Sequence, residues 1–520
     1  MALRVLFRQC GLRRAAVRKR CTAAAPAAEC PFGFRQKVEQ QREEGGGATL
    51  KPYLAIPSAK GLPVLGTTME ILKYGGAAKM HEYCDMRHKQ LGSIFREKLG
   101  PVEAVVVGDK ELISSVYNSE EQYPRHMVPE PWLIYNQKKG IERGLFFMDG
   151  PQWLQKRKIL NHSLLAPQEV TKYGNYVGGI VEDLISRWNM LSPEHGGIVP
   201  NLETELYNWS IETLGTIVFG RRLNCVALPG QTSEMQNFVH YVQKIFGESA
   251  KMTLLSPKLA ATLRLPVWRR FEDAADNAIR IARDCTEQRI SELKNVSELR
   301  DHGVIGRLLA EKNVSRNEIV NIVADLIIAA ADTTSHATQW ALYSLAKNPE
   351  CQEKLLAQIN NAVPRGQPLS VEHLDKIPYL LWIVRETLRL YPIAPFLTRQ
   401  FTVDIPLGGY RIPANTLILM SQYTMGRNPQ YFNEPNKFKP ERWLRTVKGE
   451  HQNLANGCMP FGTGARSCIG KRIAELKMRM LIAKTVQNFR LESTNDVGLA
   501  MRMITTPDKP ILINFEERKK

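Results

Sequence analysis

Residues 461–470, Phe-Gly-Thr-Gly-Ala-Arg-Ser-Cys-Ile-Gly, form a glycine-rich segment directly before an amphipathic helical pattern. The glycines at 462, 464 and 470 predict a loop with positive φ that approaches a flat ligand closely, because glycine has no β-carbon. Cys468 is expected at the N-terminus of the following helix, where free N–H groups and the helix dipole favour an anion. We predict a thiolate presented to a metal, although a lone cysteine is more often an inert core residue.

The spacing F-x-x-G-x-R-x-C-x-G resembles the haem-binding loop of the cytochrome P450 superfamily. The resemblance implies a mainly α fold with small β-sheets, built as one large haem domain. It implies haem b as the cofactor, with Cys468 as the metal ligand that pushes electron density toward O–O cleavage. It further implies that Phe461 shields the sulfur and that Arg466 binds a haem propionate.

Glu386 and Arg389 form an E-x-x-R pair in a helix expected to start at Pro378 and to end before Pro392. Residues three apart share a helix face, so an ordinary surface ion pair is the simpler interpretation. The segment Phe438-Lys-Pro-Glu-Arg-Trp443 resembles the family's meander, whose arginine joins that pair in a buried network. The resemblance implies this role for Arg442.

A long apolar helix is predicted around Ala329-Ala-Ala-Asp-Thr-Thr334. Ser315 and Glu318 form a capping box and Asn348-Pro349 ends the pattern, which gives about 32 residues, roughly 48 Å. A core helix whose threonines bond back to carbonyls is one interpretation. The resemblance implies instead an oxygen-activation site, in which Asp332 and Thr333 are catalytic and deliver protons. The family commonly has glycine at the position of Ala330.

Trp153 and Arg157 lie four residues apart in a further helical segment. Alone, this spacing indicates a surface arginine that packs its stem on an indole. In the P450 family the same W-x-x-x-R spacing sends both side chains to a haem propionate. The resemblance adds Arg399, in the extended run after Pro395, as another propionate ligand.

The N-terminal residues 1–28 contain seven arginines and lysines and no acid, interleaved with apolar residues. This composition is typical of a mitochondrial transit peptide, with a basic tail that binds nucleic acid or acidic lipid as the alternative. We expect a transit peptide at 1–30, a flexible linker at 31–55 and the P450 monooxygenase domain at 56–520. No apolar stretch of eighteen residues occurs, so no spanning helix is expected.

The N-terminal segment carries seven of the +18 formal charges, and the +11 on the rest of the chain suits an acidic partner. Within the P450 resemblance, a mitochondrial member receives electrons from an acidic ferredoxin and its reductase, as a peripheral protein on the matrix face of the inner membrane. Nucleic acid is not an expected partner. The nine cysteines contain no C-x-x-C pair, which argues against a zinc site or a disulfide framework. The basic residues expected at the ferredoxin contact are Arg385, Lys471, Arg472, Lys477 and Arg479.

Three segments resemble the insect ecdysteroid 2-hydroxylases of this family: residues 87–100, 143–150 and 265–271. The resemblance implies a steroid substrate and O₂, with hydroxylation at carbon 2 of 2-deoxyecdysone to give ecdysone. Two alternatives remain: a mitochondrial monooxygenase of another sterol or a xenobiotic, and a non-catalytic haem-thiolate binding protein. Apolar stretches near the expected pocket favour a largely apolar ligand.

Overall fold

The computed structural model describes residues 49–62, 66–99, 102–142, 144–226, 234–253, 256–294, 298–364, 367–444 and 457–518. The transit peptide predicted at 1–30 and the linker up to residue 48 lie outside the described residues. Residues 50–520 form one folded unit.

Helices dominate this unit, as the fold class predicted from the sequence requires. The longest are α14 (Arg316–Ala346) and α12 (Pro266–Glu292). The other α-helices are α2 (Thr68–Lys73), α3 (Met80–Leu91), α4 (Lys110–Asn118), α5 (Glu130–Lys139), α6 (Gly150–Leu165), α7 (Pro167–Lys172), α8 (Gly174–Glu194), α9 (Leu202–Phe219), α10 (Glu234–Lys251), α11 (Pro257–Thr262), α13 (Gly303–Ala310), α15 (Pro349–Ala362), α16 (Val371–Asp375), α17 (Pro378–Leu390), α18 (Gln422–Met425) and α20 (Lys471–Asn488). Short 3₁₀ turns are η1 (Tyr53–Ala55), η2 (Gly76–Lys79), η3 (Leu299–Asp301) and η4 (Pro440–Trp443).

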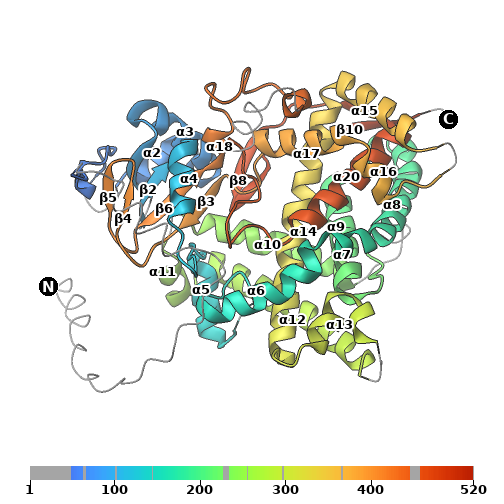
Figure 1. The fold of residues 1–520 in the computed structure, drawn as a ribbon, viewed down its shortest axis with the longest axis horizontal. Coiled ribbons are helices and arrows are strands. Elements are labelled where there is room, and N and C mark those ends of the chain that lie inside the picture. Colours follow the sequence, from blue (N-terminus) through green and yellow to red (C-terminus); the bar gives the residue numbers. More distant parts are fainter. Residues whose placement is uncertain are drawn as a thin grey trace. The chain divides into compact units, whose positions relative to one another are not determined.

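The strands form one four-stranded sheet, in the order β1-β2-β6-β3, and three two-stranded pairs. The sheet joins β1 (Ile94–Leu99) and β2 (Val102–Val107) to β6 (Leu417–Ser421) and β3 (Phe396–Arg399). Strands β2 and β6 run parallel, with Ala104 opposite Leu417, so segments that are far apart in the sequence lie side by side in one sheet (Figure 1). The pairs are β4 (Ile405–Leu407) with β5 (Tyr410–Ile412), β7 (Phe489–Ser493) with β10 (Ile513–Glu517), and β8 (Leu499–Arg502) with β9 (Ile504–Pro507).

Residues 51–55, the last of the predicted linker, contact the folded unit. Lys51 pairs with Tyr410 as an isolated parallel bridge, and its backbone N–H donates to the Gly409 carbonyl at 3.0 Å. The hydroxyl of Tyr53 donates to Glu103 at 3.2 Å. These contacts attach residues 51–55 to the β4–β5 pair and to β2.

The predicted central helix is confirmed as α14, which contains 31 residues. Ser315 is its N-cap and forms the capping box with Glu318 in both directions, which satisfies two backbone donors that the helix leaves free. Most of its residues are buried, because α14 packs against α9, α12 and α20 on different sides. Figure 1 shows α14 running through the middle of the helical part of the molecule.

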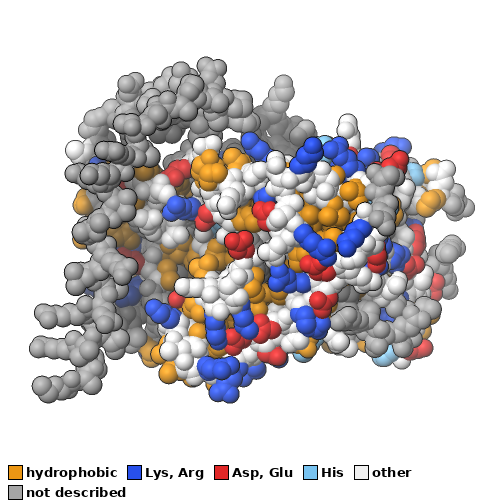
Figure 2. Space-filling view, turned by 90° about the horizontal axis from the view of Figure 1, so that it is seen from below, with side chains coloured by type: hydrophobic (Ala, Val, Ile, Leu, Met, Phe, Trp, Pro, Cys, Tyr) orange, Lys and Arg blue, Asp and Glu red, His pale blue; other side chains and the backbone are white. Residues whose placement is uncertain are grey.

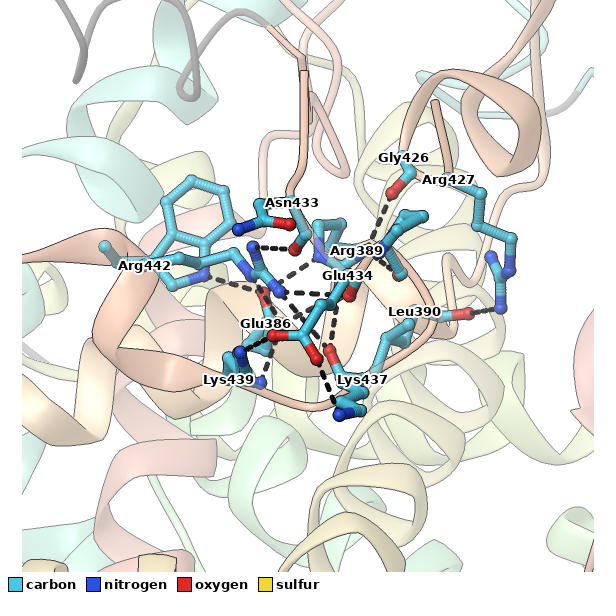
Figure 3. A network of polar contacts seen from close by, with 12 residues as sticks. Glu386, Arg389, Leu390, Gly426, Arg427, Asn433, Glu434, Lys437, Lys439 and Arg442 are labelled. Carbon is cyan, nitrogen blue, oxygen red and sulfur yellow. Dashed lines mark hydrogen bonds and ion pairs between the residues drawn. The ribbon is translucent and has the colours of Figure 1, made fainter. Parts of the chain in front are cut away.

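Glu386, on α17, is the centre of a buried polar network (Figure 3). Arg389 donates through Nε and Nη2 to its two carboxylate oxygens at 2.9 and 2.7 Å. Arg442 Nε and Trp443 Nε1 donate to the same carboxylate at 2.9 and 3.0 Å. Both members of the E-x-x-R pair have no exposed side-chain surface, so the surface ion-pair interpretation is wrong. The prediction that Arg442 joins the pair is confirmed.

Arg389 ties this network to the loops that follow α18. Its guanidinium also donates to the backbone carbonyls of Gly426, Pro435 and Lys437. Because a buried guanidinium needs a partner for each of its donors, these bonds fix the path of residues 426–437 relative to α17.

Lys477 lies inside the protein, so the prediction that it is an exposed contact for an electron donor is wrong. It sits on a buried face of α20, with 1% of its surface exposed, and its side chain reaches α9. Its ammonium donates to the carbonyl and the hydroxyl of Ser210 at 2.9 and 3.2 Å and lies 5.1 Å from the ring centre of Trp209. Burial lowers the pKa of Lys477 to about 7.

Replacing Glu386 with Gln should destabilise the fold strongly, because the amide removes a charge that two buried guanidiniums and an indole N–H require. Breaking a buried pair of this kind costs about 3–5 kcal/mol. The measurement is the denaturant midpoint of unfolding. Glu434→Gln is the matched control, since Glu434 lies in the same region but pairs with Lys437 and Lys439 at the surface. Equal losses for the two variants would contradict the assignment of Glu386 as the centre of the network.

Replacing Lys477 with Met should change how stability depends on pH. The pKa is about 7 in the folded chain and 10.5 when unperturbed, so between these values the unfolded chain binds more protons. The wild type therefore gains stability as pH rises through this window, and the Met variant lacks that gain. The free energy of unfolding of the wild type should rise relative to that of the Met variant by about 1.4 kcal/mol per pH unit between about pH 7.5 and 9.5. Parallel pH curves for wild type and variant would show that Lys477 is not a buried titrating group.

Candidate functional site

The cysteine loop folds back on itself before α20 begins. The backbone N–H of Cys468 donates to the carbonyl of Phe461 at 2.8 Å, which closes the loop at its ends. Gly462 and Gly464 have φ of 65° and 75°, as the sequence predicts. Gly470 is the N-cap of α20 with φ of −87°, so its predicted positive φ is wrong. A side chain at Gly464 would collide with the carboxylate of Glu120, which explains the glycine at this position.

The thiol of Cys468 has accessible surface, although the protein around it raises its pKa. Burial is the main cause, while the N–H of Gly470 and the nearby Arg157 act in the opposite direction. Without a bound metal, desolvation therefore outweighs the favourable contacts at the helix terminus, and the thiolate form of Cys468 stays a prediction. A bound metal cation reverses the balance, since a thiol that coordinates a metal is deprotonated.

Arg466 lies next to Cys468 in the loop and reaches across to two other segments. Its Nε donates to the carbonyl of Pro124 at 2.8 Å, and its Nη2 donates to Met148 O and Asp149 Oδ1 at 2.8 and 2.6 Å. The guanidinium lies 3.9 Å from the ring centre of Trp153, the tryptophan of the W-x-x-x-R motif. The loop and α6 are therefore brought together, as the sequence predicts.

Arg157 and Arg399 complete a cluster of three guanidiniums with Arg466. Arg157 Nη2 donates to Ser467 O at 2.7 Å, while its Nε is buried and has no hydrogen-bond partner among the described residues. Arg399, on β3, donates through Nε to Glu120 at 2.7 Å. The pKa of Arg466 is lowered to about 10. Burial is the main cause, and the charges of Arg399 and Arg157 also lower it, while Asp149 acts in the opposite direction. The three guanidiniums carry more positive charge than the carboxylates of Glu120 and Asp149 balance.

His126 belongs to the same cluster and was not singled out from the sequence. Its two ring nitrogens are buried and have no hydrogen-bond partner among the described residues. The pKa of His126 is lowered to about 3, mainly by burial and in addition by the charges of Arg466 and Arg399. No motif spacing marks His126, so only the fold reveals it. Unsatisfied donors beside three guanidiniums fit an anionic ligand such as a carboxylate.

The residues predicted for oxygen activation lie on α14. The hydroxyl of Thr333 donates to the Ala329 carbonyl at 2.9 Å, and Ala329 is exposed on a helix whose other faces are largely buried. Ser210 on α9 donates to the carbonyl of Ala330 at 3.0 Å. The hydrogen bond from Thr333 to the Ala329 carbonyl is the geometry that the core-helix interpretation predicts. The accessible surface of Ala329 indicates that space lies beside this part of α14.

Asp332 points into the protein beside these residues. It is 2% exposed, and its Oδ2 is buried with no hydrogen-bond partner among the described residues. Burial raises the pKa of Asp332 to about 6, against the lowering effect of His336. A carboxyl with this pKa exchanges a proton near neutral pH, as a general acid requires. Among the described residues, Asp332 and Thr333 make no hydrogen bond or ion pair to the cysteine loop.

The donor set fits a haem group on two independent grounds. One accessible thiol in a closed loop is a suitable axial metal ligand, and the thiolate form needs the cation. The guanidiniums and His126 can hold the two carboxylates of such a group, and their unsatisfied nitrogens need an anion. The described residues contain no group of three or more His, Cys, Asp or Glu side chains suited to another metal.

The surface gives limited information about partners. Basic and acidic side chains are interspersed with apolar ones on the face shown in Figure 2, rather than forming a single basic stripe. Within the described part of the chain, the helices are too short or too polar to cross a membrane.

Comparisons with known proteins agree with this geometry. A sequence profile of the family described as Cytochrome P450 matches residues 56–515. The chain is 35% identical to "Cytochrome P450 315a1, mitochondrial" of Drosophila melanogaster, over 91% of this chain and 90% of that protein. It is 34% identical to "Cytochrome P450 10" of Lymnaea stagnalis, over 95% and 91% of the two chains. It is 31% identical to "Cholesterol side-chain cleavage enzyme, mitochondrial" of Mesocricetus auratus, over 92% of each.

The profile covers most of the chain, and the relatives match it from end to end at more than 30% identity. The mainly helical fold with small sheets and the closed cysteine loop are those of a haem-thiolate protein. The chain therefore belongs to the cytochrome P450 family, in its mitochondrial class, and is an oxidoreductase that acts as a monooxygenase.

Proposed function

We propose that the protein binds haem b through Cys468 and hydroxylates a steroid, with carbon 2 of 2-deoxyecdysone as the position attacked. The observation that carries the cofactor assignment is the accessible Cys468 thiol in its closed loop, next to a guanidinium cluster that needs an anion. When bound, the haem supplies the centre at which O₂ is reduced and one oxygen atom enters a C–H bond.

The protein's own residues then hold and orient this group. Arg466, Arg399, Arg157 and Trp153 bind the propionates, and His126 donates to one of them from its uncharged ring. Because donors around a carboxylate are directional, the cluster would orient the group once it is bound. Following the family resemblance, Phe461 would shield the sulfur and so support the thiolate as an electron donor to the metal.

Asp332 and Thr333 supply protons on the side of the helix α14. A carboxyl whose pKa is about 6 is protonated and deprotonated readily near neutral pH, and the adjacent hydroxyl can pass its proton onward. The side chain of Ala330 is a methyl group where the family commonly has none. Ser210 holds the Ala330 carbonyl from α9, which limits movement of this segment.

An acidic ferredoxin, reduced by its reductase, is the proposed electron donor. Lys471 and Arg472 are exposed on the first turn of α20, three and four residues after Cys468. Arg479 donates hydrogen bonds to the Leu374 carbonyl and the Asp375 carboxylate, so it contributes less to the attraction of the ferredoxin than a free cation does. With Lys477 buried, the docking charge lies at the start of α20 and at Arg385 on α17.

Exposed apolar residues support a peripheral position on the matrix face of the inner mitochondrial membrane. Leu259 on α11 and Leu263, the C-cap of that helix, are 55% and 60% exposed. Leu133 on the neighbouring helix α5 is 49% exposed. Apolar side chains on short surface helices can enter the headgroup region without a spanning segment.

The steroid assignment rests on relatives and on likeness in three segments. The relatives include proteins named "Cholesterol side-chain cleavage enzyme" and "Sterol 26-hydroxylase". Two of the segments that resemble ecdysteroid 2-hydroxylases meet in the core, where the Trp132 ring lies 5.9 Å from Phe147 and 5.4 Å from Phe271. Their likeness therefore supports a shared framework around the pocket, while the position of attack depends on how the steroid is held over the haem.

Reconstitution with ferredoxin, ferredoxin reductase, reductant and O₂ tests this proposal. 2-Deoxyecdysone should yield ecdysone, with one oxygen atom from O₂ in the product, as shown by isotope labelling and mass spectrometry. Ecdysone itself, which already carries the hydroxyl at carbon 2, is the matched control and should not be turned over. Turnover of a different sterol, with 2-deoxyecdysone unchanged, would move the function to another mitochondrial sterol hydroxylase.

A further inference from the structure

Asp332 needs a source of protons that its immediate surroundings do not provide. The carboxyl is almost fully buried, and one of its oxygens has no partner among the described residues. A buried acid that gives up a proton in each turnover must be reprotonated before the next one. The structure should therefore contain a route from Asp332 to solvent.

His336 lies one helical turn after Asp332 and is 3% exposed. Its Nδ1 is 2.9 Å from the backbone carbonyl of Asp332 and 3.7 Å from the carboxylate Oδ1. Since that carbonyl can only accept, Nδ1 carries the hydrogen and Nε2 is the free acceptor of the neutral ring. The ring is packed edge-on against Tyr207, with centres 5.6 Å apart.

Glu203 faces the other side of this ring. Its Oε1 is 3.8 Å from Nε2 of His336, a separation that one bridging water or a small side-chain rotation closes. Glu203 stands in the first turn of α9 and its side chain is 44% exposed, so it exchanges protons with bulk water. Gln243 on α10 donates to the same oxygen at 3.3 Å and limits its movement.

We propose that Glu203 and His336 form a relay that carries protons from solvent to Asp332. The proposal rests on the proposed function, in which Asp332 and Thr333 deliver protons for the reduction of O₂. It adds two residues that neither the family motif nor the spacing of the sequence indicates.

The proton balance of the relay is simple. Glu203 takes a proton from water and gives it to Nε2 of His336, while Nδ1 releases its proton to Oδ1 of Asp332. No electron moves, and the net result is one proton transferred from solvent to the buried carboxyl. A turn of the imidazole ring restores the starting tautomer.

The charges that face Asp332 come from three elements. His336 on α14 and Arg502 on β8 lower its pKa, and Glu203 on α9 raises it, while burial remains the largest effect. Tyr207 on α9 and Gln243 on α10 contact the relay without a charge. Removing Glu203 and removing His336 should therefore shift the titration of Asp332 in opposite directions, which a general loss of structure would not produce.

The test uses the haem-loaded protein with Glu203→Gln and His336→Gln. Each variant should form about tenfold less product per O₂ consumed, less than the 10²–10⁴-fold effect of losing a general acid because water can partly replace the relay. Peroxide should increase correspondingly, and the solvent deuterium isotope effect should change. Infrared titration of the Asp332 carboxyl in the resting protein, assigned with Asp332→Asn, should show a lower pKa in Glu203→Gln and a higher pKa in His336→Gln.

Glu205→Gln is the matched control, because Glu205 stands two residues away on α9 but pairs with Arg187 instead of His336. It should leave the coupling and the titration of Asp332 unchanged. If Thr333→Ala and Asp332→Asn lose coupling while Glu203→Gln and His336→Gln keep it, the relay is wrong and the proposed function stands. If Thr333→Ala also keeps full coupling, the role given to α14 fails together with the relay.

Discussion

The desolvation of Cys468 is the constraint on which the rest of the site depends. Burial raises the pKa of its thiol, and the N–H of Gly470 and the charge of Arg157 do not overcome that effect. The polypeptide alone therefore favours the neutral thiol, and a metal cation is what makes the thiolate stable. The same enclosure that opposes the free anion keeps water from the sulfur once the metal is bound, so the loop is suited to a permanent ligand.

The guanidinium cluster presents the complementary requirement. Arg157, Arg399 and Arg466 lie close together, and Glu120 and Asp149 balance only part of their charge. His126 adds buried nitrogens without partners. One group that carries a cation at its centre and carboxylates at its edge satisfies both needs, and haem is such a group. The buried Glu386 network fixes residues 426–437, which precede the cysteine segment in the sequence.

The sequence predicted the parts of the site that depend on local spacing. The capping box at Ser315, the extent of α17 and the union of Arg442 with Glu386 and Arg389 follow from patterns within a few residues or from a family motif. It failed where burial decides. Lys477 has the spacing of a surface residue, yet it is buried in the fold, where its ammonium reaches Ser210 on α9. His126, His336 and Glu203 are brought to the site by contacts between distant elements, which no spacing along the chain reveals.

The ligand of the haem iron is the central claim, and the absorption spectrum of the reduced carbon monoxide complex tests it most directly. Wild-type protein should give the red-shifted band that thiolate ligation produces in this family. Cys468→His should bind haem through the unchanged guanidinium cluster but lose that band, because a neutral imidazole replaces the thiolate. Retention of the red-shifted band in Cys468→His would show that another residue is the ligand and would contradict the account.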